Sequence, residues 1–176
     1  MSQDQYVSSL EWRVPASVRA AWPTLTISSR AAIDLESQSV ELIAQGPAHT
    51  DGDIAVWIPS ANVLVMGDLM TSSGYPVIDE SSHGSLRGVI QAVERLRQLI
   101  NSESVVVPGH GPIGNRDSLC NFRDMLCSVE GRIKPMMASG SSLAEILAAA
   151  PTADFDLFWG RGYVTGDIFV RMVVAG

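Results

Sequence analysis

Three short apolar runs place the strongest constraint on how this chain can fold. Residues 54–58 (IAVWI), 63–66 (VLVM) and 105–107 (VVV) are apolar at both the odd and the even positions. Because successive side chains of a β-strand point to opposite faces, a sheet built from these strands must be covered on both faces. Residues 59–62 (PSAN) are typical of a turn, so the first two runs are expected to form a hairpin.

Two later segments supply a cover for one face only. Apolar residues recur at helical spacing from Leu86 to Ile100 and from Leu119 to Met136, which predicts helices near residues 84–100 and 117–138. Residues 24–28, 32–36 and 40–44 favour further antiparallel strands. The expected fold is an α/β (α+β) layered one, with a mixed, mostly antiparallel sheet of roughly five to seven strands and helices on one face.

Side chains that can bind a metal follow these runs. His49 lies in the loop of residues 46–53 (GPAHTDGD), Asp68 follows the second run, and His110 lies in residues 108–112 (PGHGP) after the third. Two imidazoles and a carboxylate from neighbouring strand ends, with glycines for tight turns, can build a concave metal site. Structural interpretations stand beside this one: His49 as a loop histidine bonded to a carboxylate, Asp68 as a turn cap, and His110 as a solvated turn residue.

In their order and spacing, the GPAHTDGD loop, the Gly67-Asp68-Leu69 step and the PGHG segment resemble the second half of a metallo-β-lactamase superfamily domain, of the glyoxalase II-like hydrolase branch. Residues 75–79 (YPVID) and the tail from 151 to 159 fit as well, so the resemblance covers roughly residues 40–176. It implies half of a four-layer αββα sandwich. It also implies zinc ligands at His49, Asp68 and His110, with Asp68 bridging two ions.

The sequence departs from that family in its first ligand cluster. The family motif H-x-H-x-D-H is absent, and the only histidines are His49, His83 and His110. Each of two metals would keep two protein ligands, whereas a catalytic zinc typically has three and an open position. The resemblance therefore implies an ancestral hydrolase of an ester, thioester or lactam, with weakly or partly bound zinc and catalytic residues that the sequence does not identify.

Three functions are compatible with these features. The chain is a metal-dependent hydrolase whose missing ligands come from elsewhere, a non-catalytic homodimeric module, or a half-enzyme that complements a separately encoded N-terminal half. A homodimer would cover the second apolar sheet face through a two-fold axis. The competing cover is the segment from Leu10 to Pro23, as a short helix or docked arm carrying Trp12 and Trp22.

The length and net charge of the chain limit its number of domains and its classes of partner. The chain of 176 residues is long enough for one domain, divided here into an N-terminal arm (1–23) and a half-domain (24–176), with residues 1–9 expected to fray. A net charge of −7 argues against nucleic acid and anionic membrane as partners. No apolar run approaches the roughly 20 residues of a membrane-spanning helix, and the N-terminus lacks the pattern of a signal peptide.

Other candidate residues have structural interpretations. Cys120 and Cys127 lie seven residues apart in a predicted helix, about 10 Å along its axis, so no disulfide is expected and a cytoplasmic location follows. His83 is expected at the surface. Asp51 and Asp53 are expected to hold backbone amides in the loop, and Trp159 and Tyr163 to be core or interface aromatics.

Overall fold

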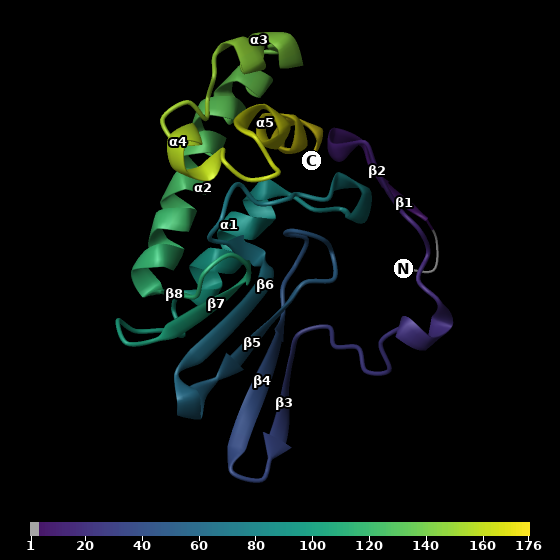
Figure 1. Ribbon diagram of the computed structural model, residues 1–176, viewed down its shortest axis with the longest axis vertical. Coiled ribbons are helices and arrows are strands. Elements are labelled where there is room, and N and C mark those ends of the chain that lie inside the picture. Colours follow the sequence, from purple (N-terminus) through teal and green to yellow (C-terminus); the bar gives the residue numbers. More distant parts are fainter. Residues whose placement is uncertain (1–3) are drawn as a thin grey trace.

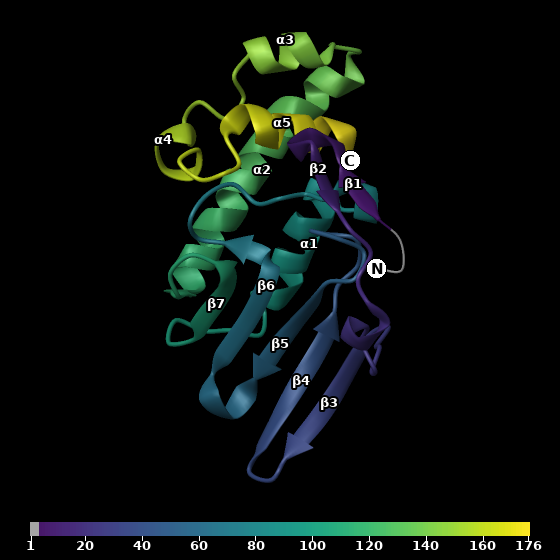
Figure 2. The same ribbon diagram turned by 45° about the vertical axis from the view of Figure 1, so that its right-hand side comes forward.

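The computed structural model describes residues 4–176 and consists of a six-stranded sheet with helices on one side (Figure 1). Helices α1 and α2 pack against the sheet, and α3, α4 and α5 gather at the end opposite the β3–β4 hairpin (Figure 2). The strands of the sheet are β3 (Arg30–Leu35), β4 (Gln38–Ala44), β5 (Ile54–Ile58), β6 (Val63–Thr71), β7 (Val105–His110) and β8 (Gly114–Asn115). The helices are α1 (Leu86–Leu96), α2 (Arg116–Ala138), α3 (Leu143–Ala148), α4 (Asp156–Trp159) and α5 (Gly166–Ala175).

The sheet is mixed and mostly antiparallel, as the sequence predicted. Its strand order is β3-β4-β5-β6-β7-β8, and only the β6–β7 pair is parallel. The parallel pair is joined by a crossover through α1, whereas β5 and β6 form the predicted hairpin. In that hairpin a 3-10 turn (Pro59–Ala61) precedes Asn62, which has the left-handed φ of 54° that asparagine tolerates.

The predicted helices form and cover one sheet face. The Ser85 side chain caps α1, and Asn115 and Ser118 make a capping box at the start of α2. Buried side chains from alternate strand positions, such as Leu64 and Val106, pack with buried residues of these helices, such as Phe122, in one hydrophobic core. The inward-facing side chains of the strands and the apolar faces of the two helices therefore form the core, as the sequence indicated.

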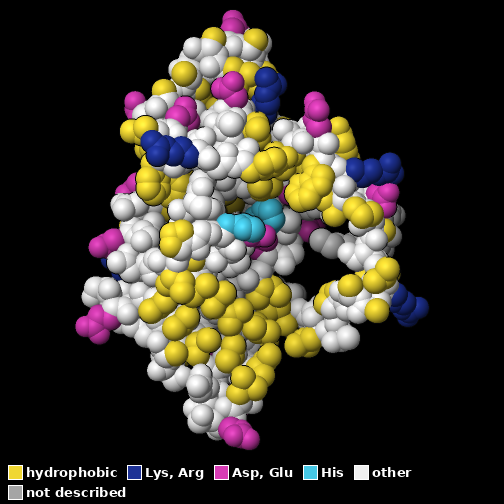
Figure 3. Space-filling model, viewed as in Figure 1, with side chains coloured by type: hydrophobic (Ala, Val, Ile, Leu, Met, Phe, Trp, Pro, Cys, Tyr) yellow, Lys and Arg dark blue, Asp and Glu magenta, His cyan; other side chains and the backbone are white. Residues whose placement is uncertain are grey.

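The opposite sheet face has no cover among the described residues. Cross-strand pairs place its apolar side chains in rows, for example Leu42 opposite Val56 and Val56 opposite Val65. Figure 3 shows hydrophobic side chains gathered over the strands in the lower half of the molecule. This outer face consists of Ala31, Ile33, Leu35, Val40, Leu42, Ile54, Val56, Ile58, Val63, Val65, Val105 and Val107. Leu35 is 56% exposed and Ile54 40% exposed, so a real apolar surface faces solvent.

The N-terminal arm docks elsewhere and does not cover this face. Its strands β1 (Gln5–Val7) and β2 (Trp12–Val14) form a small antiparallel sheet beside α5 and the turn of residues 80–82. The Glu80 carboxylate accepts hydrogen bonds from the Ser8 hydroxyl (2.6 Å) and the Ser9 amide (3.0 Å). Burial alone would raise the pKa of Glu80, but these hydrogen bonds outweigh it and lower the pKa.

Two expectations about the first thirty residues were wrong. Residues 4–9 are not frayed, because Val7 is buried and Gln5–Val7 pairs with Trp12–Val14; residues 1–3 lie outside the described part of the chain. Residues 24–28 form no strand, because β3 begins at Arg30, where pairing with β4 starts. A strand-like composition gives no strand without a neighbour to pair with.

Two further helix starts, the cysteines and the lengths of the helices complete the description of the fold. A capping box formed by Ser142 and Glu145 opens α3, and the Thr165 side chain caps the start of α5. Cys120 and Cys127 are both free thiols. Within residues 4–176, no helix has the length and apolarity required to cross a membrane.

Candidate functional site

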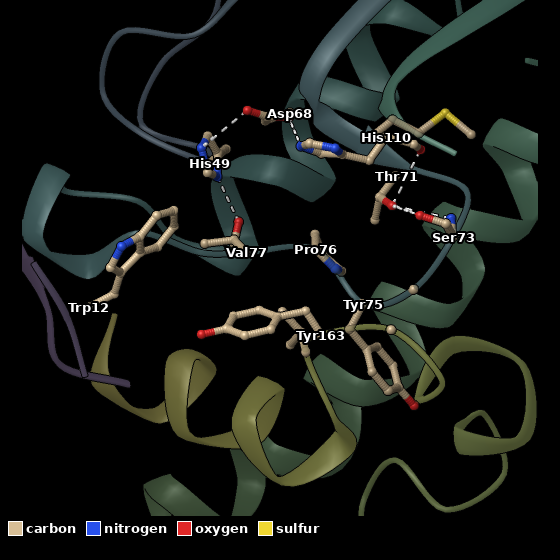
Figure 4. Close-up of a pocket in the computed structure, with 14 residues that line it drawn as sticks. Trp12, His49, Asp68, Thr71, Ser73, Tyr75, Pro76, Val77, His110 and Tyr163 are labelled. Carbon is tan, nitrogen blue, oxygen red and sulfur yellow. Dashed lines mark hydrogen bonds and ion pairs between the residues drawn. The ribbon is translucent and has the colours of Figure 1, made fainter. Parts of the chain in front are cut away.

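Three segments bring His49, Asp68 and His110 together (Figure 4). His49 lies in the loop between β4 and β5, Asp68 lies within β6, and His110 is the last residue of β7. The sequence placed Asp68 and His110 after the ends of their strands, but both strands continue through these residues. The reason is Gly67, whose φ of 53° produces a register shift against β7 instead of ending β6.

A second glycine allows the two strands to come close beside the site. A Cβ atom on Gly109 would lie 2.3 Å from Asp68 Oδ1 and 2.7 Å from the carbonyl carbon of Gly67. Only a residue without a side chain fits there, so the β7 backbone passes directly beside the carboxylate. His110 follows immediately and is thereby placed next to Asp68.

Each oxygen of Asp68 faces one imidazole. His110 Nε2 lies 3.1 Å from Oδ1, and His49 Nε2 lies 3.7 Å from Oδ2. The side chain of His49 is 20% exposed, whereas that of His110 is 74% exposed. The carboxylate therefore lies between one sheltered and one solvent-facing histidine.

The tautomer of His49 is set by a backbone carbonyl. The Val77 oxygen can only accept, so the Nδ1–H of His49 donates to it across 2.8 Å. In the neutral ring Nε2 then carries a lone pair that faces an oxygen of Asp68. His49 Nε2 and Asp68 Oδ2 are then two acceptors that face each other, and a proton or a cation between them would bind both atoms. A carbonyl behind the ring is also how proteins orient a metal-binding histidine.

The donors nevertheless do not complete a metal site. Among the residues that the structure describes, no group of three or more His, Cys, Asp or Glu side chains could hold a metal ion. Asp68 pairs with one imidazole at each oxygen, which gives two pairs of donors and no triad, whereas a catalytic zinc takes three protein ligands and a water. Metal binding by these three residues stays a prediction.

The loop around His49 is held by hydrogen bonds of two kinds. The Asp53 carboxylate accepts from the amide (3.0 Å) and the hydroxyl (3.0 Å) of Thr50, as expected of a structural aspartate. The His49 carbonyl accepts from the Asp79 amide across 3.0 Å, which ties the loop to the segment before α1. Asp51 differs from expectation: its carboxylate faces the exposed His83 at 3.2 Å and accepts from no backbone amide of residues 4–176.

A cavity of about 460 Å³ opens beside the three residues. Its wall includes Trp12 from β2, the Tyr75–Val77 segment, and Tyr163 from the loop before α5. The Tyr75 ring stacks on Phe169 at 4.8 Å, and its hydroxyl donates to Asp156 across 2.8 Å. Burial, followed by the hydrogen bond to this carboxylate, raises the pKa of Tyr75 above its ordinary value.

Sequence reasoning missed the cavity wall. It placed Trp12 in a possible cover for the sheet and took Tyr163 as a core or interface aromatic, but both side chains line the cavity. No sequence signal pairs them, because they lie near opposite ends of the chain in segments without apolar periodicity. Trp159, by contrast, is 9% exposed and belongs to the core as expected.

Comparison with known families matches residues 10–110 to the metallo-beta-lactamase superfamily. This match starts upstream of the region in which the motifs resemble that family and stops at His110. Among curated proteins, the metallo-beta-lactamase type 2 of Bacillus cereus is 28% identical over 90 residues, which are 51% of this chain and 35% of that protein. The protein of the same name from Bacteroides fragilis is 22% identical over 104 residues, which are 58% of this chain and 42% of that protein.

A solved structure is similar over a comparable stretch. The metallo-beta-lactamase from Pontibacter korlensis superposes with a TM-score of 0.51 at 26% identity, covering 59% of this chain and 48% of that one. The mixed α/β fold thus matches part of the fold of that protein. The chain matches well under two thirds of the length of each of these relatives.

Proposed function

Because the chain belongs to the metallo-β-lactamase superfamily, we propose that His49, Asp68 and His110 are its contribution to the metal site of a hydrolase. The observation that carries this proposal is the Asp68 carboxylate, which presents one oxygen to each of two imidazoles. The Val77 carbonyl supports it by leaving the Nε2 lone pair of His49 directed at the same carboxylate. The substrate class is an ester, a thioester or a lactam, as the resemblance to the glyoxalase II-like branch and the names of the relatives suggest.

The same geometry limits what the chain does alone. Two donors per ion hold zinc weakly, and a catalytic ion needs at least one more protein ligand. In this proposal the missing donors come from a second polypeptide. We derive no catalytic step from the donors present.

Zinc titration of the purified chain tests this proposal. We expect weak binding that dialysis against a chelator removes, and an Asp68→Asn variant with at least about tenfold weaker binding, because Asp68 contributes to both donor pairs. His83→Ala is the matched control, since His83 is an exposed histidine paired with Asp51. Equal zinc affinity in the Asp68 variant and the parent chain would remove the basis of the proposal. Stoichiometric zinc that survives the chelator would show that the donor set is complete after all.

The uncovered sheet face supports a second candidate, the non-catalytic homodimer. Two copies packed face to face through a two-fold axis would bury the apolar rows of β3 to β7. At about 25 cal/mol per Å², roughly 800 Å² per partner is worth tens of kcal/mol before the costs of association. In this arrangement each copy of the chain forms one half of an αββα sandwich, and the second copy forms the other half.

Sedimentation analysis over a wide concentration range decides between these arrangements. A homodimer is expected to persist on dilution and to dissociate when Val65, at the centre of the outer face, is changed to Lys. Leu157→Lys is the control, because Leu157 is 75% exposed on the far helical end. A dilution-stable monomer would reject the homodimer. A complex that forms only with a polypeptide carrying H-x-H-x-D-H, and that then hydrolyses substrate, would identify a half-enzyme.

A further inference from the structure

The cavity beside Asp68 has two chemically different ends. One end holds the carboxylate and the two imidazoles, and the other is walled by Trp12 and Tyr163 (Figure 4). These two aromatic side chains are 56% and 70% exposed. Large aromatic surfaces left open toward a cavity, and not packed into the core, are typical of a ligand-binding wall.

Both aromatic residues are held in place by the fold. Trp12 pairs with the buried Val7 in the small sheet of the arm, and the Glu80 carboxylate fixes that arm through Ser8 and Ser9. Tyr163 is followed by the buried Val164 and by the Thr165 cap of α5. The backbone positions of Trp12 and Tyr163 are therefore set by the fold, so a ligand that binds there loses little free energy to ordering the backbone.

The charge of the lining narrows the ligand class. Asp68 is the only acidic side chain among the described residues that line the cavity, and none of these residues is Lys or Arg. In the metal-free cavity a free anionic ligand would meet the Asp68 carboxylate, and no Lys or Arg of the lining would pair with it. A neutral planar group instead gains aromatic contact with Trp12 and Tyr163.

We propose that this cavity binds neutral carbonyl compounds with a planar aromatic substituent, the aromatic group lying against Trp12 and Tyr163 and the carbonyl at the end that holds the imidazoles of His49 and His110. The statement deepens the proposed hydrolase function: its substrates are aryl-substituted neutral esters, thioesters or lactams. Recognition of the aromatic group depends on the protein wall and requires no metal.

Binding of N-(2-naphthyl)acetamide to the metal-free 176-residue chain tests the proposal. This probe is neutral, carries a carbonyl and resists hydrolysis. In NMR spectra of the ¹⁵N-labelled indoles, the Trp12 signal should shift saturably, whereas that of Trp22, which lies outside the cavity lining, should stay fixed. N-cyclohexylacetamide, which is apolar but not planar, and 2-naphthoate, which is anionic, should each bind at least about fivefold more weakly.

Variants of the wall locate the binding. Trp12→Ala and Tyr163→Ala should each weaken binding about tenfold, or about 1.4 kcal/mol, and Trp12→Phe should weaken it less. Trp22→Ala is the matched control and should change nothing. Because Tyr163 lies outside the arm, its variant remains informative if Trp12→Ala releases the arm.

Three results would overturn the proposal: no saturable shift at Trp12, equal affinity for the cyclohexyl compound, or unchanged affinity in both Trp12→Ala and Tyr163→Ala. The test is separate from that of the metal site. If the probe binds as expected but Asp68→Asn leaves zinc affinity unchanged, the hydrolase assignment fails and the aromatic site stands. If zinc behaves as expected but the probe does not bind, only the ligand class fails.

Discussion

Substituting Gly88 by Ala should destabilise the protein, although Ala is the better helix former. Gly88 lies in the first turn of α1, where a Cβ atom would lie 1.6 Å from the Pro47 carbonyl oxygen and 2.7 Å from its carbonyl carbon. Real Cβ atoms essentially never approach closer than 3.0 Å to another heavy atom, so the helix and the loop must separate by more than 1 Å. The loop concerned is the one that carries His49.

The magnitude follows from the contacts that this separation breaks. Overpacking costs about 1–3 kcal/mol. The bond from the Ser85 amide to the Ala48 carbonyl (2.8 Å) also joins helix and loop, and weakening it costs about 1 kcal/mol. The helix propensity of Ala offsets up to about 1 kcal/mol. The net loss in the free energy of unfolding is expected to be about 1–4 kcal/mol.

Urea unfolding followed by far-UV circular dichroism measures this loss. Gly131→Ala is the matched control, because Gly131 is also helical and its Cβ would meet nothing within 4 Å. That variant should be more stable than the parent chain by about 0.5–1 kcal/mol. If Gly88→Ala is as stable as Gly131→Ala, the close contact between α1 and the loop does not exist in solution and the reasoning is refuted.

Three further outcomes are expected. Acid should release the N-terminal arm. Because the pKa of Glu80 is lowered in the folded state, the ionised carboxylate stabilises the docked arm at pH values above its unfolded pKa. This stabilisation is lost as the pH falls through the folded pKa. NMR signals of the backbone amides of the arm monitor its release. Glu80→Gln should release the arm already at neutral pH. An arm that stays docked in acid and in this variant would contradict the prediction. Leu64→Ala should cost about 3–5 kcal/mol in urea unfolding because Leu64 is fully buried, whereas Val65→Ala, on the open face, should cost less than about 1 kcal/mol in the monomer; equal losses would mean that both faces are covered. Tyr75→Phe removes the hydroxyl that donates to Asp156 and should lower the unfolding free energy by about 1–2 kcal/mol, and an unchanged melting temperature would show that this bond contributes nothing.

The sequence by itself predicted most strands of the main sheet and its two covering helices, and it singled out the three residues of the candidate metal site. Strands such as Ile54–Ile58 and helices such as Leu86–Leu96 follow from periodicity, because the alternation of side chains depends only on backbone geometry. His49, Asp68 and His110 were found because each stands in a short motif beside a strand. The open second face of the sheet was also foreseen, since both faces of three strands are apolar and one-sided helices cover only one.

Only the tertiary structure decided how these parts meet. Strands β6 and β7 lie far apart in the sequence and pair only in the folded protein. Their pairing produces the register shift at Gly67, brings Gly109 beside Asp68, and places one imidazole at each Asp68 oxygen. The arm docks through Glu80, and Trp12 joins Tyr163 in one cavity wall, because of contacts between residues near opposite ends of the chain. Local patterns carry no information on such contacts, since they arise only when distant segments compete to bury the same surface.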